Sequence, residues 1–134
     1  MQGMSRYAKN AGAVFSLKYH IVWCPKYRRP VLVGLIEERL KQVLADVAEK
    51  HDITIHAMEV MPDHVHVFLE ADTTLCVSEI TNRLKGTSSK ILRAEFSELR
   101  TRLPTLWSRS YFAATVGSVS DASIKRYIEN QKGR

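Results

Sequence analysis

The ten residues MPDHVHVFLE, positions 61 to 70, decide how this chain is expected to fold. Read as a β-strand, the segment alternates between two faces, because successive side chains point to opposite sides. One face is apolar and consists of Val65, Val67 and Leu69. The other face carries His64, His66, Phe68 and Glu70. The apolar face is typical of a strand that packs on a core, so the two histidines are expected on the face that points away from the core.

The flanking sequence predicts further strands and helices. Residues 14 to 23 alternate as a strand that ends before Pro25, and residues 35 to 50 have the spacing of an amphipathic helix. The other elements expected are a strand at 53–60, a helix at 77–99, a strand at 111–116 and a C-terminal helix capped by Ser118 or Ser120. The short connection at positions 61 to 63 predicts an antiparallel hairpin.

The resulting order, β-α-β-β-α-β followed by one more helix, predicts an α+β fold of the ferredoxin-like or RRM-like kind. In this fold four antiparallel strands carry two helices on one face and leave the other face free. We expect a single domain over residues 1–134, because no linker or low-complexity segment divides the chain. If the apolar side of the 61–70 strand points at the helices, His64 and His66 lie on the free face.

The composition favours a polyanionic partner such as nucleic acid. Lys and Arg number 20 against 14 Asp and Glu, which gives a formal charge of +6 and a sequence pI near 9.5. Cys24 and Cys76 form no C-x-x-C pair, so we expect no disulfide scaffold. No apolar run approaches the length of about 18 residues that a membrane span needs, and no secretory leader is evident. These features predict a cytoplasmic protein.

Two side-chain patterns bear on chemistry. Histidines at i and i+2 of a strand project in parallel and can ligate one metal ion, although structural hydrogen bonding explains such a pair equally well. On the C-terminal helix, Tyr127 and Gln131 stand at i and i+4 and share a face. The alternative is that Ile124, Tyr127 and Ile128 simply pack this helix on the body of the protein. From the residues alone, both patterns remain open.

Four ordered motifs give the chain a resemblance to a known family. They are YHIVWCPKYRRPVL at 19–32, MPDHVHVFLE at 61–70, LKGTSSKILR at 84–93, and SYFAATVG with IKRYIENQ within 110–131. In order and spacing they resemble the TnpA-like, single-tyrosine HUH transposases of the insertion-sequence 200/605 family, where HUH denotes His, hydrophobic residue, His. The resemblance covers about residues 14–131, which is nearly the whole chain.

The resemblance implies a catalytic site. His64 and His66 match the metal ligands of the HUH motif, Tyr127 matches the nucleophile, and Gln131 matches the third protein ligand. A divalent ion, Mg²⁺ or Mn²⁺, would act as a Lewis acid on a phosphate oxygen, and the two imidazoles favour Mn²⁺. The implied activity is that of a DNA transposase, which cleaves and rejoins single-stranded DNA at insertion-sequence ends. The implied intermediate is a 5′-phosphotyrosine beside a free 3′-hydroxyl.

The resemblance also implies the partners. The expected substrate is single-stranded DNA folded into imperfect hairpins near the element ends. We expect a homodimer, and we leave open whether Tyr127 serves its own metal site or that of the partner subunit. The basic residues expected to contact DNA phosphates are Lys26, Arg28, Arg29, Lys85, Lys90 and Arg93.

Other residues receive more ordinary interpretations. Glu59 is a candidate partner of the metal ligands if it shares their face, and Asp63 is expected to shape the hairpin loop. Structural or surface positions are expected for the remaining histidines, His20, His51 and His56. Trp23 and Trp107 are expected in the core or in a dimer interface, rather than as platforms for stacked bases.

Two alternative functions stay open. A host-retained relative would use the same tyrosine chemistry to process repeated palindromes instead of mobilising its own element. A non-catalytic module would bind single-stranded nucleic acid on the open face of the sheet, but it predicts exposed aromatic residues where His64 and His66 stand. A two-metal hydrolase is disfavoured because the chain offers no cluster of carboxylates.

Overall fold

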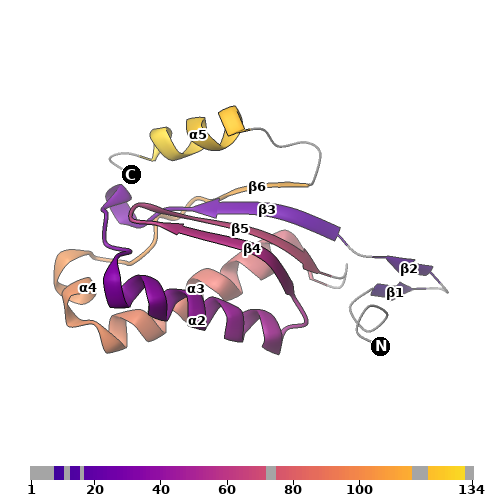
Figure 1. Cartoon of the computed structure of the whole chain (residues 1–134), viewed down its shortest axis with the longest axis horizontal. Helices are drawn as coiled ribbons and strands as arrows, with labels where there is room; N and C mark the ends of the chain where they lie inside the picture. The colour runs from indigo at the N-terminus through magenta and orange to yellow at the C-terminus, as the bar shows by residue number, and fades with distance from the viewer. Residues whose placement is uncertain (1–7, 11–12, 16, 72–74, 116–120, 132–134) are drawn as a thin grey trace.

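The computed structural model shows one main sheet, a separate pair of short strands, and helices on both sides of the main sheet (Figure 1). The structure describes residues 8–10, 13–15, 17–71, 75–115 and 121–131. The helix cap predicted at Ser118 or Ser120 lies outside these residues.

The main sheet contains the four strands that the sequence predicts. They are β3 (Leu17–Trp23), β4 (Thr54–Met61), β5 (His64–Ala71) and β6 (Phe112–Thr115). Their spatial order is β4-β5-β3-β6, and every neighbouring pair is antiparallel. The first and third of these strands, β3 and β5, therefore occupy the centre, and the predicted ferredoxin-like arrangement is confirmed.

Helices lie on both faces of this sheet. α2 (Gly34–Lys50) and α3 (Val77–Glu95) lie together beneath the sheet in Figure 1, whereas α5 (Asp121–Asn130) lies above it. The buried side chains of α2 recur at helical spacing: Ile36, Leu40, Val43, Leu44, Val47 and Ala48. The face that the sequence leaves free is thus partly covered by the helix that carries Tyr127.

β5 divides its side chains as predicted. Val65, Val67 and Leu69 are fully buried in the core. His64 and His66 alternate with them and are partly exposed on the opposite face, which α2 and α3 do not cover. The burial of the apolar side of β5 therefore sets where the histidines can be.

Both tryptophans belong to the core, which agrees with one of the two predicted roles. The rings of Trp23 and Trp107 meet edge to face, with their centroids 5.8 Å apart. Nε1 of Trp107 donates to the carbonyl of Lys85 and to the hydroxyl of Ser88, each at 3.1 Å. These bonds fix the segment before β6 to α3.

The helix predicted at 77–99 is interrupted. α3 ends at Glu95, and a short helix, α4 (Ser97–Arg102), follows. Between them Phe96 has an extended backbone, with φ −120° and ψ 101°, and its side chain packs against the core. Burial of this aromatic ring against the core accompanies the break in the helical pattern.

The N-terminal part of the sheet also differs from the prediction. The strand expected at 14–23 begins at Leu17 as β3, because β2 (Ala13–Phe15) pairs with β1 (Ala8–Asn10) in a separate sheet. After β3 the chain makes a single 3₁₀ turn, η1 (Lys26–Arg28). Among the described helices, none is long and apolar enough to cross a membrane.

Candidate active site

The open face of the sheet brings side chains of four strands into one row. His66 on β5 pairs with Glu59 on β4 and with Val22 on β3, and Val22 pairs with Phe112 on β6. Residues paired directly across antiparallel strands share a face. Glu59 therefore lies on the same face as His66. Its predicted role as a partner of the metal ligands depends on this placement.

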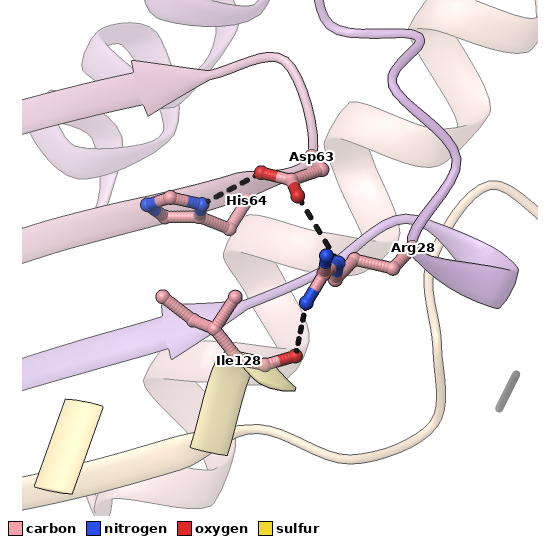
Figure 2. Close-up of polar contacts among 4 residues, drawn as sticks. All are labelled: Arg28, Asp63, His64 and Ile128. Carbon is pink, nitrogen blue, oxygen red and sulfur yellow. Dashed lines mark hydrogen bonds and ion pairs between the residues drawn. The ribbon is translucent and has the colours of Figure 1, made fainter. Parts of the chain in front are cut away.

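His64 is held by the aspartate that precedes it. Nδ1 of His64 lies 2.9 Å from Oδ1 of Asp63. An ionised carboxylate only accepts hydrogen bonds, so Nδ1 carries the proton, and in the neutral form of the ring Nε2 keeps a lone pair. Oδ2 of Asp63 pairs with Nε of Arg28 at 3.1 Å, as Figure 2 shows. A carboxylate that fixes one nitrogen of a histidine is typical of metal-binding imidazoles.

His66 is paired with another histidine. Nδ1 of His20 on β3 lies 3.0 Å from Nε2 of His66. The ring of His20 also stacks on Phe68, with centroids 4.9 Å apart and planes 15° from parallel. When His20 donates the shared proton, the lone pair of His66 Nε2 accepts it, so a metal ion at this nitrogen would have to displace His20. Both histidines of the HUH motif lie on the same face of β5, and a metal ion there would compete with His20 for His66.

Tyr127 and Gln131 share a serine on the loop before β6. The phenol oxygen of Tyr127 lies 3.0 Å from Oγ of Ser110, and this Oγ donates to Oε1 of Gln131 at 2.7 Å. Ser110 has one hydroxyl proton, so when it donates to Gln131 it accepts the proton of Tyr127. Ser108 donates a second bond to the same Oε1, at 3.3 Å. The amide of Gln131 is buried, with 4% of the residue exposed.

The loop that carries these serines is fixed to the body of the protein. The backbone N–H of Ser108 donates to the carbonyl of Cys24, at the end of β3, at 2.9 Å. From α3, the ammonium of Lys85 donates to the three successive carbonyls of residues 108–110, at 2.7, 3.4 and 3.2 Å. Burial lowers the pKa of Lys85 to about 8, while the three carbonyls favour its charged form.

Residues of α5 adjacent to Tyr127 line a cavity next to the histidines. A cavity of about 330 Å³ between helix and sheet is lined by Glu59, Met61, His64, His66, Ile124, Lys125 and Ile128. Tyr127 and Gln131 instead contact the serine loop. Within the part of the chain that the structure describes, no group of three or more His, Cys, Asp or Glu side chains could hold a metal ion. The structure therefore shows two separate groupings, His64 with His66 on β5, and Tyr127 with Gln131 at the serine loop.

The phenol of Tyr127 is protonated at neutral pH. Burial raises the pKa of Tyr127 to about 12, and the hydrogen bond to Ser110 acts in the opposite direction. The ring of Phe112, with its centroid 6.0 Å away, is part of this enclosure. A nucleophilic role therefore requires that the phenol lose its proton as it attacks.

The six basic residues predicted to contact DNA fall into two groups. Three direct their cationic groups at acceptors within the chain: Arg28, Lys85 and Arg93. The other three are exposed or half-buried: Lys26, Arg29 and Lys90. Nζ of Lys26 lies over the ring of the exposed Tyr27, 5.2 Å from its centroid. Arg29 and Lys90 leave their charges at the surface.

Sequence reasoning missed His20, Ser108 and Ser110. The sequence alternation of β3 could have revealed His20, because Tyr19, Ile21 and Trp23 share one face and His20 must point to the other, which is the face of His66. No sequence pattern identifies the two serines, because they lie in an irregular segment. They contact α5 only because the fold brings this segment next to the helix.

Comparison with known proteins bears on the family. The family model described as "Transposase IS200 like" matches residues 13–131. The chain is 39% identical over 125 residues to the ISDra2 transposase TnpA of Deinococcus radiodurans, an alignment that covers 92% of this chain and 89% of the relative. The chain belongs to the IS200-like transposase family.

Further matches of this IS200-like transposase agree with that assignment. It is 34% identical over 119 residues to the IS200 transposase of Salmonella typhimurium, covering 87% of this chain and 78% of that one. A crystal structure of a candidate transposase from Deinococcus radiodurans R1 superposes with a TM-score of 0.85 at 37% identity, covering 95% of this chain and 99% of that chain. The predicted fold and family are thus confirmed.

A more distant structure shares the fold. The REP-associated tyrosine transposase, solved bound to a REP hairpin, superposes with a TM-score of 0.57 at 14% identity. The match covers 92% of this chain and 65% of that chain.

The raised pKa of Tyr127 can be measured directly. We expect the difference in phenolate absorbance between the wild-type IS200-like transposase and its Tyr127→Phe variant to titrate with a midpoint at about 12. Once the phenol ionises, the Ser110 hydroxyl can turn from Gln131 and donate to the phenolate, which lowers this pKa, so Ser110→Ala should move the midpoint upward. A midpoint at the ordinary tyrosine value of about 10 would show that the phenol is not enclosed as described.

Proposed function

We propose that this IS200-like transposase cleaves and rejoins single-stranded DNA at insertion-sequence ends, through a covalent bond between Tyr127 and a 5′-phosphate. The placement of α5 is the observation that supports this most. The helix that carries the tyrosine lies over the same face of the sheet as His64 and His66, with a cavity between them (Figure 1). A nucleophile and a phosphate-binding site are thereby held within one small region of the fold.

The two histidines suit a divalent metal such as Mg²⁺ or Mn²⁺. Asp63 orients His64 with Nδ1 as the donor, which leaves Nε2 of the neutral ring for a metal, and a metal bound at Nε2 of His66 would replace its contact with His20. We propose Gln131 as the third ligand, through the amide oxygen that accepts from two serine hydroxyls in this structure. When bound, the metal offsets negative charge on the scissile phosphate and orients it.

Tyr127 supplies the nucleophile in this proposal. Its oxygen forms a bond to phosphorus, the bond between phosphorus and the 3′-oxygen breaks, and the DNA leaves with a free 3′-hydroxyl. The phenol proton is lost as the bond forms, and the departing 3′-oxygen gains a proton. The phosphotyrosine linkage keeps a phosphodiester bond, so attack by a 3′-hydroxyl rejoins the strand without ATP.

The arrangement around α5 supports a homodimer in which the sites are completed between subunits. Within one chain, Tyr127 and Gln131 are occupied by Ser110, and the helix turns Ile124 and Ile128 toward the histidine pair. A productive site needs the phenol and the amide released from the serine loop and directed at a histidine pair. We propose that α5 of one subunit supplies Tyr127 and Gln131 to the histidines of the other.

The proposed substrate is single-stranded DNA with imperfect hairpins near the element ends. The net charge of +6 supports a polyanionic partner. The REP-associated transposase that shares this fold was solved with a hairpin bound. Among the predicted phosphate contacts, Lys26, Arg29 and Lys90 have the most accessible charges, whereas Lys85 serves the serine loop.

The structural match to the REP-associated tyrosine transposase favours a second candidate function. A host-retained relative would process repeated palindromic hairpins with the same residues, and the REP-associated tyrosine transposase was solved bound to a REP hairpin. The DNA around the gene separates the two functions, because an intact insertion sequence carries matching subterminal hairpins at both ends.

Covalent capture of DNA tests the proposed chemistry. With a labelled hairpin from the flanking DNA and Mg²⁺ or Mn²⁺, we expect a protein–DNA adduct that survives denaturing electrophoresis. EDTA, Tyr127→Phe and His64→Ala should each reduce the adduct at least a hundredfold, which is about 3 kcal/mol of lost activation. Tyr111→Phe is the matched control, because it removes a phenol from a neighbouring segment, and it should retain the adduct. Hairpin binding without an adduct under any of these metals would favour a non-catalytic binding module instead.

The salt dependence of binding separates DNA contacts from internal contacts. Lys90→Met and Arg29→Met should each weaken hairpin binding and reduce the slope of log affinity against log salt by about 0.7 to 0.9. Lys85→Met should leave that slope unchanged and lower the free energy of unfolding by about 1–3 kcal/mol, because three carbonyls lose their donor. A reduced slope for Lys85→Met with unchanged stability would reverse these two assignments.

A further inference from the structure

The guanidinium of Arg28 bridges two elements that are distant in sequence. Its Nε pairs with Oδ2 of Asp63 in the β4–β5 loop at 3.1 Å, and its Nη1 donates to the carbonyl of Ile128 in α5 at 3.2 Å. Figure 2 shows these contacts as a chain that continues to His64, whose Nδ1 is hydrogen-bonded to the other oxygen of Asp63. One planar cation therefore connects the tyrosine-bearing helix to a histidine of the HUH motif.

The acceptor on α5 is one that a helix leaves available. Ile128 lies in the last turn, where backbone carbonyls lack partners four residues ahead. Its carbonyl accepts from the N–H of Gln131 at 3.1 Å and from Arg28. A cation at this end also interacts favourably with the helix dipole. Arg28 thus holds α5 at the end nearest Gln131.

The backbone around Arg28 is held in an unusual conformation. Tyr27 and Arg28 both have positive φ, at 60° and 53°, although neither is glycine. Such a conformation is unfavourable for residues other than glycine and persists where the surrounding structure fixes it. The N–H of Arg28 donates to the carbonyl of Pro25 at 2.8 Å, which closes the turn. This turn directs the guanidinium between Asp63 and Ile128.

We propose that Arg28 is a positioning residue that couples the orientation of His64 to the seating of α5 on its own chain. The inference rests on the proposed function in taking His64 as a metal ligand. When α5 is seated, the Ile128 carbonyl and Asp63 hold the two ends of the planar guanidinium group of Arg28. When α5 leaves, the guanidinium loses one acceptor, and Asp63 and His64 become free to reorient. The orientation of the His64 imidazole thereby depends on whether α5 is seated.

The test needs neither DNA nor metal. Arg28→Met removes the guanidinium and keeps an unbranched side chain, and Arg29→Met is the matched control at the exposed neighbouring position. We expect amide hydrogen exchange of residues 124–131 to accelerate at least fivefold in Arg28→Met and less than twofold in Arg29→Met. Nitrogen NMR should show His64 mainly as the Nδ1–H tautomer in the wild type and as a mixture in Arg28→Met.

The reciprocal variant tests the coupling itself. Asp63→Ala makes no direct change to α5, yet it should accelerate exchange of residues 124–131 at least twofold, because the guanidinium loses the carboxylate that orients it. Arg28→Lys, which keeps the charge but cannot span both acceptors, should behave like Arg28→Met and serves if the methionine variant does not fold. Faster exchange in α5 with an unchanged His64 tautomer would reduce Arg28 to a helix anchor and overturn the coupling. Unchanged exchange in both Arg28 variants would overturn it as well.

These readouts are independent of the proposed chemistry. If the wild type forms no covalent adduct but Arg28→Met changes both exchange and tautomer, the proposed function fails and the coupling stands. If the adduct forms and neither readout changes, the coupling fails and the proposed function stands.

Discussion

The alternation of β5 is the constraint on which the rest of the structure depends. Burial of Val65, Val67 and Leu69 against the helices fixes the register of this central strand, because a shift by one residue would expose all three. The same alternation forces His64 and His66 onto the opposite face, next to Glu59 and the strand that carries His20. An arrangement suited to metal binding therefore follows from how the core is packed, and the polar residues around the two histidines only refine it.

The second determinant is the seating of α5 over that face. Ser108 and Ser110 hold Gln131 and Tyr127 at one side of the helix, and Lys85 holds the loop that carries the serines. In this position Tyr127, the proposed nucleophile, is enclosed and protonated, while Ile124, Lys125 and Ile128 of the same helix line the histidine cavity. In the proposed chemistry the phenol must leave Ser110 before it attacks a phosphate.

The sequence predicts the parts of this structure that arise from periodicity. Strand alternation and helical spacing were sufficient for the order of elements, for the face of His64 and His66, and for Tyr127 and Gln131 sharing a side of the last helix. The contacts of Asp63 with Arg28 could not be predicted in this way, because they depend on a left-handed turn at two residues that are not glycine. The break at Phe96 was missed for a similar reason, since burial of one ring overrides a helical pattern that continues through it.

Mixing two inactive variants tests the central proposal, which is that the histidines of one subunit and Tyr127 of the other act as one site. One variant lacks the histidine pair (His64→Ala with His66→Ala) and carries a size tag, and the other is Tyr127→Phe. The account predicts that the mixture regains the covalent adduct and that the DNA is attached to the tagged histidine variant, whose Tyr127 uses the partner's intact histidines. If mixed dimers form and no adduct appears on either polypeptide, the site is not completed between subunits and the account is contradicted.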